Sequence, residues 1–387
     1  MVALLQETGS ANGLVGFGVC DAEPFTEVRA EMDRRLAGGE SGRLRFTYAD
    51  PEVATDVRRS FPWATRLVSG ATTYLPAGGN PGPAQANHGR VARFATSDLY
   101  QPLQRGLGAM RGILQSAGYR AEVLVDDNRL VDRAAAVRAG IAWWGKSTMV
   151  LTPRYGPWTL LGSVVTDARL PVTTPMVRDC GTCVACIPAC PTGALDEEGT
   201  LEATRCISYW AQMPGSIPAD IRAAWGDRLY GCDDCLEVCP PGQRWLAVAQ
   251  DQVGWVDLLG LLAQSDDQLR TIYAHFYMPR NDPVYLRRNA LVALGHSGGL
   301  EAVPVVAGYL RNPRPLLRVH AGWSLGQIGG SEAVAALKTA VAGEADPIVL
   351  VEIETALAAL ATTDQQTRNE ERGVGGYPGV DGGPGCL

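Results

Sequence analysis

The first 175 residues alternate short apolar runs with amphipathic stretches. Apolar residues at helical spacing over Leu103–Ala117 predict a helix with one buried face. Short apolar runs predict buried strands, and they are Leu14–Val19, Leu67–Tyr74, Ala121–Val125 and Thr159–Val165. Because strands and helices alternate, we expect residues 1–175 to form an α/β domain.

Beyond this domain the pattern changes twice. Residues 77–89, rich in Gly and Pro, predict a loop, and residues 176–245 hold most of the cysteines. From Val253 onward the apolar positions again follow a helical period, which predicts an all-helical domain over 246–362. Residues 363–387 end in a Gly- and Pro-rich stretch and are expected to be a disordered tail.

The helical part contains a weak internal repeat. Asp282-Pro283, Asn312-Pro313 and Asp346-Pro347 each precede a Leu- and Ala-rich segment, and the prolines lie 30 and 34 positions apart. Periods of this length are typical of stacked helix pairs of the HEAT type.

The composition describes an ordinary globular protein with a net charge of −7. That charge argues against a wholly basic nucleic-acid binder but permits a local basic patch. Six arginines lie between residues 280 and 318, namely Arg280, Arg287, Arg288, Arg311, Arg314 and Arg318. They form either a solvated helix face or a surface that follows nucleic-acid phosphates, for which Arg287 and Arg318 are the candidates.

Eight of the ten cysteines fall into two spaced groups. The first group reads C-x2-C-x2-C-x3-C-P and consists of Cys180, Cys183, Cys186 and Cys190. The second group ends in C-x2-C-x3-C-P and consists of Cys206, Cys232, Cys235 and Cys239. This spacing is typical of bacterial two-cluster ferredoxins, in which the fourth Cys of each run binds the other run's cluster.

The sequence therefore predicts two [4Fe–4S] clusters with crossed ligands. One cluster is expected on Cys180, Cys183, Cys186 and Cys239, and the other on Cys206, Cys232, Cys235 and Cys190. Structural zinc sites also use paired C-x2-C units, but they do not require the x3-C-P tail that occurs twice here. Disulfides suit small secreted domains. Zinc is therefore the main alternative.

The segment Gly140–Ser147 matches the phosphate-binding pattern G-x4-G-K-[ST]. In a P-loop this pattern follows a strand and opens a helix. Here the order is reversed, because Asp132–Ala139 predicts a helix and Thr148–Leu151 a strand. An ATP site is therefore not expected, although Lys146 is available to another anionic ligand.

Taken in this order, the segments resemble tRNA epoxyqueuosine reductases, which are cobalamin-dependent iron–sulfur enzymes with a C-terminal HEAT-like domain. The resemblance runs from about residue 12 to 360. Its most specific stretches are Val125-Asp126, Leu130–Ala134, Arg138–Lys146, Pro191–Ala194, Arg205–Tyr209 and Gly226–Asp233. The implied fold is a multidomain α+β protein, with an α/β cobalamin-binding catalytic domain over 1–175, a ferredoxin-like module over 176–245 and HEAT-like repeats over 246–362.

The resemblance implies removal of the epoxide oxygen from epoxyqueuosine at the wobble position of tRNA. Cobalamin would be fed with electrons through the two clusters from a flavodoxin or ferredoxin. The implied tRNA partners carry a GUN anticodon, as those for Asp, Asn, His and Tyr do. No apolar run is long enough to cross a membrane, the N-terminus does not read as a signal peptide, and free thiolates suit a reducing compartment, so we expect a cytoplasmic protein. We also expect a monomer.

Asp126 matches the family's proposed proton donor. An epoxide opens to an alkoxide, so a positioned acid would lower the barrier. Asp126 follows the apolar run Val123–Val125, where desolvation would keep it protonated. A capping aspartate is the alternative. Cofactor contacts implied by the resemblance are Asp126, Arg133, Lys146, Val150, Leu161 and Ser208. Arg133 is also expected to pair with Asp132.

The chain departs from the family pattern at two places. Where relatives usually have Asp-Tyr-His, this chain has Asp98-Leu99-Tyr100, and where they often have Pro-Trp-Asn it has Pro240-Pro241-Gly242. None of the four histidines lies in a D-x-H-x-x-G motif, so no axial ligand of that type is supplied. The alternative functions are a related cobalamin and iron–sulfur reductase acting on a small molecule, and an iron–sulfur electron carrier.

Overall fold

The computed structural model describes residues 1–75, 86–195, 199–249 and 254–373. The chain divides into two compact units. The first unit comprises Met1–Ala84, Gly89–Val256 and Ser265–Leu286, and the second comprises Gln85–His88, Asp257–Gln264 and Arg287–Leu387. No helix in the described ranges is both long and apolar enough to cross a membrane.

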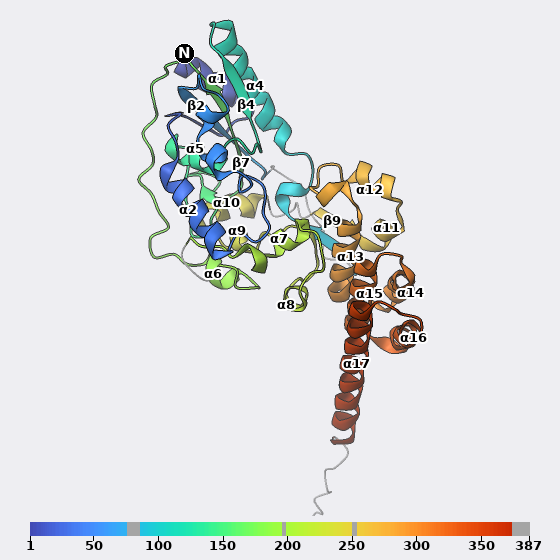
Figure 1. The fold of residues 1–387 in the computed structure, drawn as a ribbon. Coiled ribbons are helices and arrows are strands. Elements are labelled where there is room, and N and C mark those ends of the chain that lie inside the picture. Colours follow the sequence, from blue (N-terminus) through green and yellow to red (C-terminus); the bar gives the residue numbers. More distant parts are fainter. Residues whose placement is uncertain (76–85, 196–198, 250–253, 374–387) are drawn as a thin grey trace, which may run out of the picture. The chain divides into compact units, whose positions relative to one another are not determined.

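A four-stranded sheet forms the centre of the first unit (Figure 1). Its order is β1 (Gly16–Asp21), β2 (Arg66–Thr73), β7 (Thr159–Thr166), β4 (Ala121–Leu124). The sequence analysis located all four strands to within two residues. All three pairings are antiparallel, which the alternation of helices and strands did not predict.

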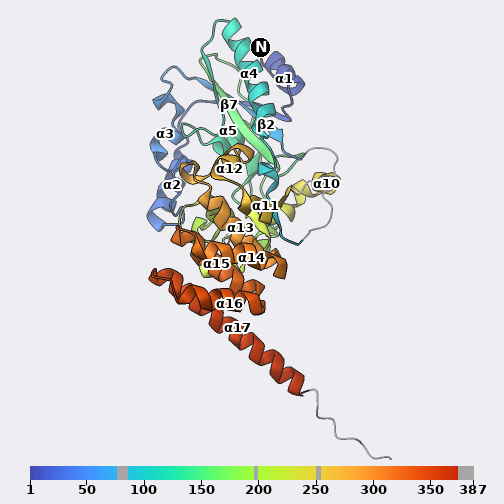
Figure 2. The same cartoon turned by 90° about the vertical axis from the view of Figure 1, so that its right-hand side faces the viewer.

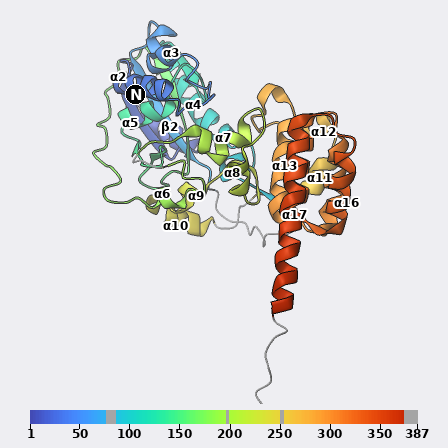
Figure 3. The same ribbon diagram turned by 60° about the horizontal axis from the view of Figure 1, so that its bottom comes forward.

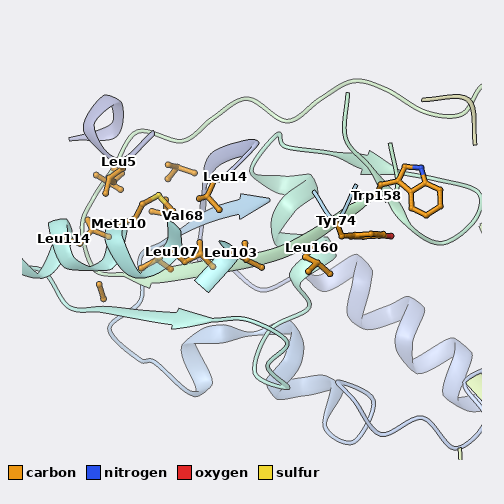
Figure 4. Close-up of a cluster of buried hydrophobic side chains, with 14 of the residues drawn as sticks. Leu5, Leu14, Val68, Tyr74, Leu103, Leu107, Met110, Leu114, Trp158 and Leu160 are labelled. Carbon is orange, nitrogen blue, oxygen red and sulfur yellow. The ribbon is translucent and has the colours of Figure 1, made fainter. Parts of the chain in front are cut away.

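Side chains alternate between the two faces of this sheet, as they must in strands. One core contains Val68 and Val164, with α4 (Tyr100–Ser116) and α1 (Val2–Ala11) contributing to it. Figure 4 shows this core, in which Leu103, Leu107 and Met110 are labelled. The neighbouring residues Leu67 and Val165 belong to the opposite core, together with α5 (Asp132–Arg138) and α2 (Thr26–Gly38).

A small parallel pairing joins β3 (His88–Val91) to β8 (Arg228–Tyr230), with β9 (Gly254–Asp257) on the other side of β3. The segment that resembles a P-loop follows α5 and enters the hairpin of β5 (Trp143–Trp144) and β6 (Val150–Leu151). The order is helix, then strand, so the expectation that this segment is not a P-loop is confirmed.

The cysteine module consists of short helices. They are α6 (Cys186–Ala189), α7 (Ile207–Gln212), α8 (Ala219–Ala223), α9 (Asp234–Glu237) and α10 (Pro240–Val248). Helix α6, from the first cysteine group, contacts α9, from the second (Figure 3). This contact brings the two cysteine groups together although many residues separate them in sequence.

The helices of the repeat region stack on one another, as the repeat predicted (Figure 2). They are α13 (Val284–Ser297), α14 (Val303–Gly308), α15 (Pro315–Ile328), α16 (Gly330–Val341) and α17 (Pro347–Gly373), and they follow α11 (Leu258–Ala263) and α12 (Asp266–Ile272) in the chain. Helix α15 contacts α14, α16 and α17. Because α17 continues to Gly373, the expectation of disorder is wrong for residues 363–373. Residues 374–387 and most of the expected 77–89 loop lie outside the described residues.

Gly18 allows α5 to lie close against β1. A Cβ at this position would be 2.0 Å from the carbonyl oxygen of Ala139, at the end of α5. We expect Gly18→Ala to lower the free energy of unfolding by about 1–3 kcal/mol, the usual range for overpacking. Gly108→Ala is the matched control, because a Cβ there meets nothing within 4 Å and alanine favours the α4 helix. Thermal melts of the two variants should move in opposite directions, and equal midpoints would contradict the close contact.

Candidate active site and cysteine groups

Four thiols surround one cavity of about 220 Å³ in the first unit. The cysteines that line it are Cys180, Cys183, Cys186 and Cys239. This is the crossed set expected from the spacing, three members of the first run and the last member of the second. Within the described ranges, no three His, Cys, Asp or Glu side chains converge closely enough to hold a single metal ion. Thiols spread around a cavity suit a cluster, in which each thiolate binds its own iron, better than a single zinc ion.

Backbone geometry shapes this cavity. Gly181 has a positive φ of 51° and the Cys183 N–H donates to the Cys180 carbonyl, so the chain turns tightly between the first two ligand positions. Cys239 immediately precedes Pro240, the first residue of α10. Proline suits the first turn of a helix, where its missing N–H is not needed. The C-P dipeptide therefore positions the fourth thiol and starts the next helix.

Lys146 lies beside the first cysteine group. Its backbone N–H approaches Cys180 Sγ at 3.5 Å, and its Nζ donates to the Gly181 carbonyl oxygen at 2.8 Å. Its side chain also lines the cavity. Lys146 therefore adjoins the first cysteine group, and its role as a cofactor contact stays a prediction.

The remaining four thiols form a second group, called the inner group below: Cys190, Cys206, Cys232 and Cys235. The Cys235 thiol lies within electrostatic range of the other three, and burial raises its pKa further than these neighbours do. Burial also raises the pKa of Cys232 to about 12. Burial acts in the same direction on Cys190, but hydrogen bonds from Thr192 and Ala194 outweigh it and lower that pKa.

Asp126 is placed at the end of β4, on the loop that leads to α5. Its φ of 51° is in the left-handed region, which aspartate tolerates better than most residues. The side chain remains open to solvent, yet the surrounding protein desolvates it and raises its pKa, and the nearby Asp127 carboxylate adds to the effect. An aspartate in this setting holds its proton to a higher pH than an ordinary surface carboxyl.

Asp127 differs sharply from its neighbour. Its Oδ2 lies 2.6 Å from Arg129 Nη2, and its Oδ1 accepts from Arg129 Nε at 2.9 Å. The guanidinium holds the pKa of Asp127 below its usual range. Asp127 is thus an ionised partner of Arg129, and of the two adjacent aspartates Asp126 is the one suited to donate a proton.

Asp132, the first residue of α5, is a second acidic group at this site. Burial raises its pKa well above the usual value, and the Asp126 carboxylate raises it further. The backbone of Asp126 hydrogen-bonds to the Asp132 carboxyl. Asp132 Oδ1 is buried and has no hydrogen-bond partner in the described part of the chain. Asp126 and Asp132 therefore form a close acidic pair in which Asp132 holds its proton to the higher pH.

Arg133 follows Asp132 on α5, and we infer that it lines a concave region, called the recess below. Its side chain is exposed, yet burial lowers the pKa of its guanidinium, a combination expected where a side chain lines a concave surface. Among the described residues it forms no ion pair, and its Nη1 donates to the Thr148 carbonyl oxygen at 3.3 Å. The expected pairing with Asp132 is therefore wrong, because the two neighbours on α5 point in different directions.

Three tyrosines that the sequence analysis did not assign to the site also face this recess. Tyr48, Tyr74 and Tyr100 all lie within electrostatic range of Arg133. Tyr100 also faces both Asp126 and Asp132, and burial raises its pKa, so its phenol stays protonated. Tyr100 occupies the position at which the sequence departs from the family pattern, and that departure was the available signal. Nothing in the sequence marked Tyr48 or Tyr74.

Tyr74 connects the recess to the inner group of thiols. Its hydroxyl donates to the Pro157 carbonyl oxygen at 3.2 Å, and it lies within electrostatic range of Cys235 as well as Arg133. The inner group is therefore the one next to the recess. Among the described residues, Tyr74 has no such link to the first group, whose four thiols line the separate cavity.

The remaining predicted cofactor contacts are placed less decisively. The β4–β7 register ends with Leu124 paired to Ser163, so Leu161 lies on the part of β7 beyond the end of β4. The backbone of Ser208, on α7, hydrogen-bonds to the Cys206 thiol, so this residue adjoins the inner group. Val150 is buried on β6. No described contact joins Val150 or Ser208 to Asp126.

Comparison with known proteins gives consistent matches. Residues 179–242 match a 4Fe-4S double cluster binding domain, and residues 278–358 match HEAT repeats. The epoxyqueuosine reductase of Bacillus cereus is 32% identical over 363 residues, which is 90% of this chain and 94% of that protein. The enzyme of Listeria monocytogenes is 35% identical over 356 residues, 88% of this chain and 93% of that protein.

Solved structures agree with these matches. A crystal structure of epoxyqueuosine reductase with an epoxyqueuosine-modified tRNA-Tyr stem loop has a TM-score of 0.83 at 30% identity, covering 93% of this chain and 98% of that one. A structure of the Bacillus subtilis enzyme, described with its aspartate-bearing catalytic loop swung out of the active site, has the same TM-score at 28% identity, covering 92% and 98%. The matches span both cysteine groups and the stacked helices.

Proposed function

The chain belongs to the epoxyqueuosine reductase family, and we propose on this premise that it reduces the epoxide of epoxyqueuosine in tRNA to the alkene of queuosine. The reaction takes up two electrons and two protons and releases the oxygen as water. The observation that carries the proposal is the recess at the end of β4, where Asp126, Asp132 and Arg133 adjoin the inner group of thiols.

The eight thiols would hold the two iron–sulfur clusters of the matching domain. Cys180, Cys183, Cys186 and Cys239 fit one cluster, because all four line a single cavity. Cys190, Cys206, Cys232 and Cys235 fit the other, because Cys235 lies within electrostatic range of the other three and Cys206 within range of Cys190 and Cys232. Bound clusters supply one-electron carriers, and the inner group is in place to serve as the last one before the recess.

The recess also fits a cobalamin. Arg133 offers a partly desolvated cation to a polar ligand, Leu161 lies on β7, which contacts α5, and Ser208 adjoins the inner group of thiols. When bound, cobalamin supplies a cobalt centre that delivers electrons to the epoxide carbon.

Asp126 would supply one of the two protons that this reaction needs. We assign its carboxyl the transfer of a proton to the epoxide oxygen as the C–O bond breaks. Tyr100 and Asp132 face the same point and keep their own protons, so they surround the oxygen with further donors. The catalytic loop of the Bacillus subtilis relative has been found swung out of the active site. By analogy, the β4–α5 loop of this chain would have a second position, and the left-handed backbone of Asp126 would be a point at which the two positions differ.

The proposed nucleic-acid partner is a tRNA stem loop, because a related enzyme has been crystallised with one. We retain the GUN anticodon as part of this proposal. The structure changes which arginines suit phosphate binding. Arg288 is fully buried beside Asn289. Arg318 forms two hydrogen bonds with the Glu344 carboxylate, and Arg287 donates to the Gln264 carbonyl. Arg311 and Arg314 are exposed on the same unit and are the better candidates.

Charge reversal at Arg311 and Arg314 is expected to weaken binding of an epoxyqueuosine-tRNA stem loop several-fold. The salt dependence of binding should also become shallower, because fewer phosphate charges are neutralised. Lys338→Glu is the control, since Lys338 is an exposed cation of the same unit on α16. Fluorescence anisotropy at two salt concentrations measures both effects. If the double variant kept the affinity for the stem loop and the salt dependence of that affinity, these arginines would be part of a solvated helix face and not of a tRNA-binding surface.

We also propose that the protein acts in the cytoplasm as a monomer and receives its electrons from a flavodoxin or ferredoxin.

The whole proposal is tested by an anaerobic assay that contains the reconstituted protein, cobalamin, a low-potential reductant and epoxyqueuosine-tRNA. Mass analysis of the nucleosides should show queuosine. A protein that holds about eight iron atoms but leaves the epoxide intact would overturn the proposed reaction.

A further inference from the structure

Three arginines near the first cysteine group are held on aromatic rings. The Arg178 guanidinium lies 5.4 Å from the ring centre of Trp143, which lines the cavity. Those of Arg154 and Arg244 lie 4.7 and 5.8 Å from the ring of Trp245. Trp245 and Arg244 belong to α10, the helix that begins with Pro240 at the wall of the same cavity.

These cations keep their charge available to a partner. All three arginine side chains are exposed, and in the part of the chain that the structure describes none forms an ion pair with a carboxylate. Asp179 also lines the cavity, but its Oδ1 accepts from the Gly181 N–H. The chain as a whole carries a net charge of −7, so a concentration of arginines here is a local exception.

Apolar side chains accompany these cations. Val184 lies between the ligand positions Cys183 and Cys186 and is 44% exposed. Val177, next to Arg178, is fully exposed. Protein interfaces commonly combine an apolar centre with charged groups that steer the partner. The aromatic rings hold the guanidinium groups in place, so little side-chain entropy is lost when a partner binds.

We propose that the face formed by Arg154, Arg178, Arg244, Val177 and Val184 is the docking surface for a small, acidic one-electron carrier protein. This inference rests on the proposed function. Each encounter would transfer one electron, oxidising the carrier and reducing the cluster held by the first group, with no proton transferred. The inner group lies on the side of Tyr74, whereas the first group shares its cavity with Trp143, the ring that holds Arg178. An electron that enters at this face would therefore pass from the first group to the inner group.

The test uses the full reconstituted protein and a purified acidic flavodoxin in its hydroquinone state as the probe. The variant carries Arg178→Glu and Arg244→Glu, and stopped-flow bleaching of the cluster absorbance gives the rate of reduction. We expect the rate to fall about tenfold or more at low salt, with the difference shrinking as salt is added. Photoreduced 5-deazariboflavin, a small uncharged reductant, should reduce both proteins at the same rate.

Two further variants complete the test. Arg105→Glu with Arg111→Glu, two exposed arginines on α4, is the matched control and should leave the flavodoxin rate unchanged. Arg178→Gln with Arg244→Gln should give an intermediate loss, which guards against a folding defect in the charge-reversed protein. If the Glu and the Gln variants of Arg178 and Arg244 were both reduced by flavodoxin at the wild-type rate, the proposed docking surface would be overturned. Failure of the proposed function would look different: clusters reduced normally, but no queuosine formed with either reductant.

Discussion

Asp126→Asn is expected to lower the turnover of epoxyqueuosine-tRNA by about 10²–10⁴-fold, the range that general acid catalysis usually contributes. Asparagine keeps the size of the side chain and tolerates the left-handed backbone found at this position, but it cannot deliver a proton to the opening epoxide. Iron content, cobalamin binding and tRNA binding should stay at wild-type levels. Single-turnover assays under anaerobic conditions measure the change, and undiminished turnover would remove Asp126 from the mechanism.

Asp127→Asn provides the control for this variant. Asp127 is ionised and paired with Arg129, so replacing it should change turnover little even though it is the adjacent residue. A loss equal to that of Asp126→Asn would show that the loop conformation, and not the acid, was removed. The pair of variants therefore separates chemistry from local structure.

The pH dependence of turnover follows from the same residue. A general acid must be protonated to act, so the rate should be full below the pKa of Asp126 and fall as pH rises through it. Burial raises this pKa, which places the fall at a higher pH than an ordinary aspartate would give. In Asp126→Asn this alkaline limb should disappear from the residual rate, whereas Asp127→Asn should retain it.

The crossed ligand sets predict that two double variants of the cysteines will behave in opposite ways. Cys180 and Cys239 line the same cavity, so removing both should destroy one cluster and leave about four of about eight iron atoms. Cys180 and Cys190 belong to different sets, so removing both should damage both clusters. If each run held its own cluster instead, the two results would be exchanged. Iron analysis and electron paramagnetic resonance of the reduced proteins distinguish the two cases.

Cys20→Ser is the control for these variants. Cys20 is buried in the core of the first unit, and burial raises its pKa to about 12, so it is an inert thiol. Its replacement should leave both clusters in place. Both cysteine double variants should also lose turnover, because each interrupts the path of electrons to the recess. Substantial iron loss in Cys20→Ser would show that iron content follows general stability and not ligation.

Much of the first unit was predictable because its signals are local. Each strand of the sheet is a short apolar run, and Asp126 was identifiable because it directly follows one of them. The crossed cysteine sets were predictable from spacing and a C-P dipeptide. The grouping of Tyr48, Tyr74 and Tyr100 around Arg133 was not, because it depends on how distant segments meet at the end of the sheet.

The second unit shows where composition misleads. Arg288 counted as part of a charged surface, but stacking of the helices buries it next to Asn289, whose Oδ1 accepts from its guanidinium at 2.8 Å. The polar stretch 363–373 was expected to be disordered, yet it continues α17. Gln, Glu and Arg favour a helix although they are polar, so the absence of apolar periodicity did not mean the absence of structure.

The contact between α6 and α9 has a consequence for survival of the protein in air. A cluster shared by Cys180 and Cys239 closes a loop of about 60 residues. A cross-link of that size lowers the conformational entropy of the unfolded chain and so stabilises the folded state by about 4 kcal/mol. Oxidative loss of that cluster would therefore do more than stop electron flow. It would remove the cross-link between the two cysteine groups and expose the segment between them to proteases. Damaged enzyme would then be degraded instead of persisting in an inactive form.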